Sequence, residues 1–252
     1  MKLRALRRDR AARIGAEPFL LERAFDDCLD RVSLMNRDFE RALLIGCPAP
    51  DWPERLGAFA AEVDVRDPGA LFAEAAEGTQ ITEDAWQPAS QTYDLVLAVG
   101  TLDTVNDLPR ALLTLRWSMM AGGWLLGAIS GGDTLPRLRS AMREADRIAG
   151  AATPHVHPRI EASALAPLLA SAGFIDPVVD VDRVSVSYAS FERLIADLRR
   201  MAATNVLVQR SRVPLSKRAY AAAAQDFSGS SDANRTTENF EILHFACRSQ
   251  GA

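Results

Sequence analysis

Small and acidic residues follow five short apolar segments of this sequence, and they are the residues best suited to hold a ligand. In chain order they are Gly46-Cys47, Asp64, Glu83-Asp84, Val99-Gly100-Thr101 and Ser130-Gly131-Gly132-Asp133. Glycine allows a ligand to approach the backbone closely. A carboxylate after the second segment can accept hydrogen bonds from both hydroxyls of a ribose. An acidic residue after the third, Asp84 or its neighbour Glu83, suits an adenine amino group.

Other arrangements of reactive residues are weaker. His155-Val156-His157 places two histidines in alternation, but no cysteine or paired carboxylate lies nearby in the sequence, so we predict no metal site. No G-x-S-x-G motif supports a serine nucleophile. We expect His155 in a loop near the mouth of a pocket. Asp133 has two readings: a contact to substrate or partner, or the N-cap of a helix that begins at Thr134.

The elements that must position these residues alternate between strand and helix. Strands are expected at 42–47, 61–65, 79–82, 93–99, 124–129, 174–180, 183–188 and 237–248. Helices are expected at 16–35, 52–60, 69–77, 107–119, 134–148, 163–172, 190–201 and 215–227. This order predicts an α/β fold, a mostly parallel seven-stranded sheet with helices on both faces and a final antiparallel strand. Ligands bind such sheets at the carboxyl ends of the strands, so Gly46, Asp64 and Asp133 should share one rim.

Composition restricts the class of protein. The 252 residues are 48% hydrophobic and 25% charged, with a formal net charge of −4, which gives no electrostatic case for nucleic acid. No apolar run is long enough for a transmembrane segment. The three cysteines are widely spaced and the basic N-terminus lacks an apolar signal core, so we predict a cytoplasmic protein. We expect an N-terminal helical arm at 1–40 and one domain at 41–252.

Longer motifs carry a resemblance to a known family. They are Val105-Asn106-Asp107-Leu108-Pro109, Gly131-Gly132-Asp133-Thr134-Leu135, Pro154-His155, Ala172-Gly173-Phe174 and the arginine-rich segment 7–13. Together they resemble one branch of the class I S-adenosylmethionine-dependent methyltransferases. That branch contains the methyltransferase-like assembly factors of mitochondrial respiratory complex I and their alphaproteobacterial relatives. It is close to the malonyl-carrier-protein methyltransferases of biotin synthesis.

The resemblance covers essentially the whole chain and implies a Rossmann-like fold with S-adenosylmethionine as cofactor. It assigns the cofactor to Gly46, Cys47, Asp64, Asp84 and Gly100, and a substrate or partner to Asp133 and His155. It implies methyl transfer to a small molecule, carrier protein or protein side chain, with hydroxylation of a protein arginine as another chemistry.

The first strand departs from the family pattern, which is acidic-x-Gly-x-Gly-x-Gly. Here the segment is Leu44-Ile45-Gly46-Cys47-Pro48-Ala49-Pro50, in which only the first glycine is kept. Each proline removes an N–H donor and adds a ring. The sequence therefore predicts weak or lost cofactor binding and leaves two functions open. One is a methyltransferase, and the other is a non-catalytic assembly factor or scaffold for a subunit of respiratory complex I.

Overall fold

The computed structural model describes residues 2–229 and 235–250. Its seven strands form one sheet in the order β3-β2-β1-β4-β5-β7-β6. The strands are β1 (Phe39–Ile45), β2 (Ala60–Asp67), β3 (Thr79–Gln80), β4 (Tyr93–Val99), β5 (Met119–Ser130), β6 (Phe174–Tyr188) and β7 (Thr236–Ser249). Strands β1 to β5 pair in parallel, and β7 runs antiparallel to both neighbours. The predicted fold class and closing strand are confirmed.

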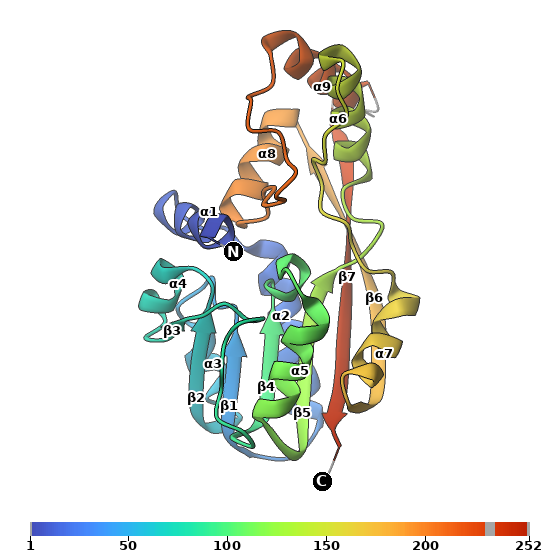
Figure 1. Cartoon of the computed structure of the whole chain (residues 1–252). Helices are drawn as coiled ribbons and strands as arrows, with labels where there is room; N and C mark the ends of the chain where they lie inside the picture. The colour runs from blue at the N-terminus through green and yellow to red at the C-terminus, as the bar shows by residue number, and fades with distance from the viewer. Residues whose placement is uncertain (1, 230–234, 251–252) are drawn as a thin grey trace.

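Helices cover both faces of the sheet because its central strands are apolar on both sides. In β1, Leu43 and Ile45 face one core and Ala42 and Leu44 face the other, as the two-residue period of a strand requires. The first core is covered by α5 (Leu108–Ser118) and α7 (Ala162–Ser171). The second is covered by α2 (Phe19–Leu34) and α3 (Trp52–Leu56). Figure 1 shows the strands of this sheet standing side by side between the helices.

A second lobe stands above the carboxyl ends of the parallel strands (Figure 1). It is built on the far halves of β6 and β7, which remain paired from Phe174–Ser249 to Tyr188–Thr236. Three helices pack there around Phe191, Phe227 and Phe240. They are α6 (Pro136–Ala149), α8 (Phe191–Arg200) and α9 (Lys217–Ser228). The prediction of two separate strands at 174–180 and 183–188 was wrong, because pairing with β7 continues through residues 181 and 182.

The N-terminal helix α1 (Lys2–Arg13) lies across the top of the parallel strands, beside α4 (Ala70–Ala75) and α8 (Figure 1). Asp9 accepts a hydrogen bond from the N–H of Leu71 at 3.0 Å. At Gly69 a Cβ would lie 2.7 Å from the Cβ of Arg8, so this small residue allows the helix to approach. The boundary at residue 40 stays a prediction. None of the described helices combines the length and apolarity that a membrane crossing needs.

The cap of α6 differs from the prediction. Asp133 is exposed, the helix begins at Pro136, and Asp133 makes no cap hydrogen bond. The buried carboxylate of Glu238 on β7 takes this role instead, accepting from the N–H groups of Arg137 at 3.1 Å and Leu138 at 2.8 Å. A tertiary contact therefore satisfies donors that local sequence was expected to satisfy.

We predict that Glu238→Ala destabilises the protein by about 1–3 kcal/mol, because it leaves buried N–H donors at the start of α6 without an acceptor. Urea denaturation followed by circular dichroism measures this. The matched control is Glu144→Ala, a partly exposed residue on α6 whose hydrogen bonds among the described residues go to Arg147. Its midpoint should equal that of the unsubstituted protein, and equal midpoints for both variants would contradict the assignment.

Candidate functional site

The ends of β1 and β4 meet so closely that Gly46 is required by packing alone. Its φ is +87°, and a Cβ there would lie 2.1 Å from the carbonyl oxygen of Val99. The N–H of Gly46 donates to the carbonyl of Arg66 at 2.9 Å. The glycine therefore marks the point where the chain leaves the sheet, at the strand ends where the cofactor cleft is expected.

The acidic residue at the end of β2 is Asp67, not Asp64. The predicted strand ended at Val65, whereas the observed strand continues to Asp67, beside the end of β1. Asp67 is fully buried, and its carboxylate accepts from the N–H of Cys47 at 2.8 Å and of Gly69 at 2.6 Å. The strand-end placement of Asp64 was wrong by three residues, because the sheet pairing extends further than the apolar run.

Asp64 has structural contacts within the sheet instead. It accepts from the phenol of Tyr93 at 2.9 Å and forms an ion pair with Arg41 at 2.9 Å. Burial, followed by the hydrogen bond to Asp64, raises the pKa of Tyr93 to about 12. Asp64 therefore does not share the rim with Gly46, contrary to expectation.

Of the two acidic residues after β3, Glu83 is the one that is buried, and it bonds to α1. Its side chain is 1% exposed, whereas Asp84 is partly exposed and accepts from the N–H of Asp107 at 3.2 Å. The sequence did not decide which of these neighbours takes the expected adenine position, because a loop position does not reveal which side chain turns inward. Asp84 contacts the start of α5 rather than the cleft.

Two arginines of α1 form ion pairs with the buried acids Asp67 and Glu83. Arg8 binds Asp67 through Nε at 2.8 Å and Nη2 at 2.5 Å, and Arg4 binds Glu83 at 2.5 and 2.7 Å. Arg8 also donates to the carbonyl of Gly100 at 3.2 Å, and Arg4 donates to the carbonyl of Thr101. All four charged side chains are at most 5% exposed. The acids, the strand end at Gly100 and the N–H of Cys47 are thus already bonded within the chain.

These residues do not fit S-adenosylmethionine in this arrangement. The carboxylate oxygens that a ribose or adenine would need are held by guanidinium groups, which are bidentate and charge-assisted. Burial raises the pKa of the Cys47 thiol to about 12, so this cysteine is neither a nucleophile nor an anionic ligand at neutral pH.

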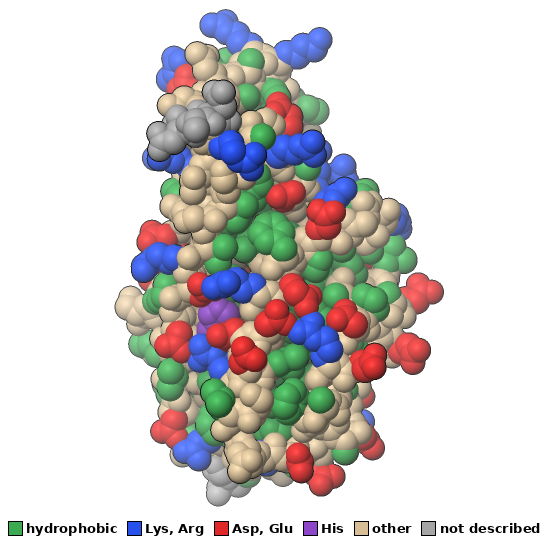
Figure 2. Space-filling view, turned by 180° about the vertical axis from the view of Figure 1, so that it is seen from behind, with side chains coloured by type: hydrophobic (Ala, Val, Ile, Leu, Met, Phe, Trp, Pro, Cys, Tyr) green, Lys and Arg blue, Asp and Glu red, His purple; other side chains and the backbone are tan. Residues whose placement is uncertain are grey.

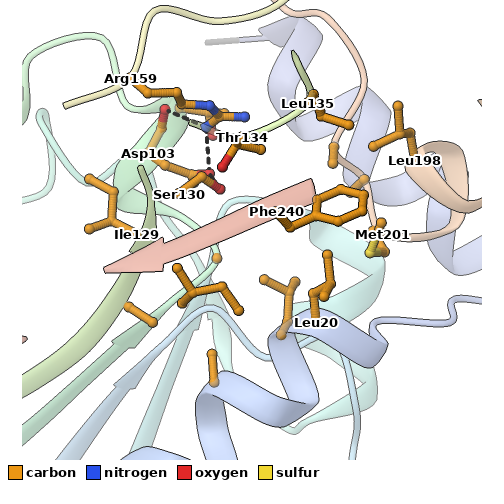
Figure 3. A pocket seen from close by; sticks show the side chains of 18 of the residues that line it. Leu20, Asp103, Ile129, Ser130, Thr134, Leu135, Arg159, Leu198, Met201 and Phe240 are labelled. Carbon is orange, nitrogen blue, oxygen red and sulfur yellow. Dashed lines mark hydrogen bonds and ion pairs between the residues drawn. The ribbon is translucent and has the colours of Figure 1, made fainter. Parts of the chain in front are cut away.

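Beyond α1 lies a narrow cavity of about 80 Å³, above the end of β5. Figure 3 shows the polar side chains of Asp103, Ser130, Thr134 and Arg159 together at one end of it and Leu198, Met201 and Phe240 at the other. Asp103 accepts from Ser130 Oγ at 2.9 Å and from Arg159 Nη1 at 2.7 Å. Burial opposes the ionisation of Asp103, but Arg159 and Ser130 outweigh it and lower its pKa.

Arg159 has unused hydrogen-bonding capacity. Its side chain is 5% exposed, and its Nε has no acceptor among the described residues. Nearby, the N–H of Val206 donates to Nε2 of His157 at 3.1 Å. Burial and the charge of Arg159 lower the pKa of His157 to about 4, so the ring is neutral at physiological pH. The histidine is an acceptor that holds the 203–207 segment.

The two residues assigned to a substrate or partner lie apart. His155 bonds through Nε2 to Asp146 at 2.8 Å and to Thr153 at 2.9 Å, at the edge of a groove beside the cavity. Exposed Asp133 lines neither space. In the described part of the chain, no three His, Cys, Asp or Glu side chains are placed to hold a metal ion.

Sequence reasoning missed Arg4, Arg8, Asp67, Asp103 and Arg159. The local signals were the basic N-terminal segment and the second aspartate of Asp64-Val65-Arg66-Asp67. The partners lie 59 and 79 residues apart in the two arginine–carboxylate pairs, so no short-range pattern joins them.

No family model matches the chain, but curated sequences do. The mouse protein named mitochondrial arginine-hydroxylase NDUFAF5 is 32% identical over 208 residues, covering 74% of this chain and 57% of its own length. The zebrafish protein of that name is 29% identical over 238 residues, covering 90% of this chain and 74% of the relative. A malonyl-acyl-carrier-protein O-methyltransferase of Xylella fastidiosa is 30% identical over 160 residues, covering 63% and 52%.

The chain is a methyltransferase-fold homologue of these proteins. Two solved structures share the fold of this chain. The YcgJ protein of Bacillus subtilis has a TM-score of 0.59 at 10% identity, covering 88% of this chain and 97% of that structure. The 4+2 cyclase SpnF has a TM-score of 0.52 at 16% identity, covering 90% and 81%. The chain spans 57% of the mouse relative.

We predict a histidine-dependent loss of stability in acid for this methyltransferase homologue. The folded pKa of His157 is about 4, below the ordinary value of 6.5, so between these pH values the unfolded chain binds the proton and the folded chain does not. Stability therefore falls as pH drops from 6.5 to 4, by up to about 3 kcal/mol from this group. His157→Gln keeps an acceptor for Val206 and should show a shallower slope in urea titrations across this window. Equal slopes for both proteins would contradict the assignment.

Proposed function

We propose that this chain is a non-catalytic assembly factor with a methyltransferase fold, which binds a partner and does not use S-adenosylmethionine. The observation that carries this is the Arg8–Asp67 pair. Both carboxylate oxygens of Asp67 are held by Arg8 and by backbone N–H groups. A cofactor ribose would have to displace a buried, bidentate ion pair, and breaking such a pair typically costs about 3–5 kcal/mol.

The loop after β1 supports the same proposal. Pro48 and Pro50 each lack an N–H donor in a segment where the family pattern has glycine. Leu44 stands where that pattern has an acidic residue, and its side chain is fully buried in the core. An anchor for a cofactor ammonium is therefore replaced by an apolar contact.

For the partner we propose a subunit of respiratory complex I, on the strength of the resemblance to its assembly factors and the NDUFAF5 relatives. A cytoplasmic location likewise stays a proposal, since those relatives are named mitochondrial. Pull-down from the native membrane fraction, with an unrelated bait as control, should recover a respiratory subunit. Recovery of nucleic acid or ribosomal proteins alone would count against this partner.

A second candidate is methyl transfer, with α1 as a cover that moves aside. Asp67 and Glu83 follow β2 and β3, where the ribose and adenine contacts are expected, and both would become free if Arg4 and Arg8 left. The malonyl-carrier O-methyltransferase relative favours this candidate and a carrier-bound substrate. SpnF, named a cyclase, illustrates that the fold serves chemistry other than methyl transfer.

Calorimetric titration of the unmodified protein separates the two candidates. We expect no binding of S-adenosylmethionine or S-adenosylhomocysteine in the micromolar range, because two lost loop donors together with the steric clash of the proline rings weaken affinity by about two to four orders of magnitude. Micromolar affinity would refute the non-catalytic proposal and favour the second candidate.

Substituted proteins then locate the cause. If the loop prevents binding, Pro48→Gly with Pro50→Gly restores it; if α1 does, Arg4→Gln with Arg8→Gln restores it. Arg10→Gln is the matched control, because Arg10 is exposed on the same helix and binds no carboxylate among the described residues. Circular dichroism verifies that each variant is folded.

A further inference from the structure

A groove of about 640 Å³ lies beside the cavity, between α1, α6, α8 and the segment 203–215. Five arginines line it: Arg7, Arg10, Arg159, Arg199 and Arg210. None of the described residues that line it is Asp or Glu. The groove contrasts with the whole chain, which has a net charge of −4. Elsewhere, arginines such as Arg31, Arg55 and Arg200 form ion pairs with acidic side chains.

Apart from Arg159, which pairs with Asp103, the arginines of this groove are not neutralised by any described residue. Arg7, Arg10 and Arg199 have no carboxylate partner within the described ranges, and Nε of Arg7 is buried without an acceptor. Burial and the repulsion of Arg10, Arg210 and Arg199 lower the pKa of Arg7. An anion placed between these side chains would relieve that repulsion and supply the missing acceptor.

Arg159 links the groove to the cavity, because it lines both. One of its nitrogens is bound by Asp103, whereas its buried Nε has no acceptor in the described residues. A guanidinium held by one carboxylate, with a donor left over, is positioned to bind a second oxygen anion.

Apolar side chains line much of the rest of the groove, beside polar ones such as Thr204, Asn205 and Ser211. Leu135, Leu138, Phe191, Ile195, Leu198 and Leu215 line it. Fixed cations beside such a surface match a ligand with an anionic group on a hydrocarbon body, since each part gains a complementary contact. A cationic ligand, such as an arginine side chain, would be repelled.

We propose that this groove binds an organic anion, a carboxylate or phosphate monoester carried on an apolar chain. The anionic group lies among the arginines and the chain lies along the leucine-rich surface. The proposal holds whether or not the protein uses S-adenosylmethionine, because the groove shares neither Asp67 nor Glu83 with the cofactor cleft.

Calorimetry on the full chain, with ligands kept below their micelle concentrations, tests this. The probes are decanoate, decyl phosphate, decanol and decylammonium, which share a chain and differ in the head group. We expect at least one anion to bind about tenfold or more tightly than decanol, with decylammonium weakest. The comparison of decanoate with decyl phosphate identifies the preferred anion. Equal binding of all four, or of none, would overturn the proposal.

Matched variants assign the site. Arg7→Gln with Arg199→Gln should weaken anion binding about tenfold or more, since each removes a charge-assisted contact. Arg200→Gln is the control: it is adjacent to Arg199, pairs with Glu17 and does not line the groove. Because Arg199 is exposed, we expect the double variant to fold, and thermal melting verifies this. A loss of anion binding by the folded variant is then assigned to the groove. Unchanged affinity in the double variant would contradict the site.

Discussion

The arrangement of the cleft depends on the buried pair between Arg8 and Asp67. A buried carboxylate is expensive unless a cation and hydrogen bonds satisfy it, and Asp67 has both. The same pair fixes α1 over the carboxyl ends of the parallel strands, with Arg4 and Glu83 as a second attachment. The Arg8–Asp67 pair therefore both stabilises this region and occupies the carboxylate that a cofactor would contact. An external ligand must compete with this pair.

Charge is distributed unevenly over the two parts of the molecule. Residues 189–229, which include α8 and α9, carry seven Lys and Arg against three Asp and Glu, while the whole chain is acidic. Figure 2 shows basic side chains around the upper lobe and many acidic ones lower down. The chain as a whole is thus acidic, but the upper lobe has a local positive potential. The arginines of the groove add to this potential beside the cavity.

The fold explains how a methyltransferase homologue can keep its architecture while its cofactor cleft changes. The ends of β1 and β4 approach too closely for a side chain at Gly46, so the sheet by itself requires this glycine. The next two glycine positions of the family pattern hold Pro48 and Pro50 here. Family resemblance in the strands and helices therefore says little about whether the cleft accepts the cofactor.

The sequence by itself determined what local periodicity and chain order can determine. Apolar runs at 93–99 and 237–248 specified buried strands, the alternation with helices specified a parallel sheet, and Asp107 at the start of the expected 107–119 helix caps α5. Each of these depends on residues close together in the chain.

Only the tertiary structure decided which acids face the cleft and what binds them. Asp67 replaced Asp64 because pairing with β1 extends β2 past its apolar run, and Glu83 turned inward because Arg4 lies there to meet it. The N-terminal N–H groups of α6 are capped by Glu238 and not by Asp133, which lies more than a hundred residues earlier in the chain. The physical reason is common to all three: a buried charge or donor is satisfied by whichever group the fold brings within about 3 Å, and sequence separation does not limit that group.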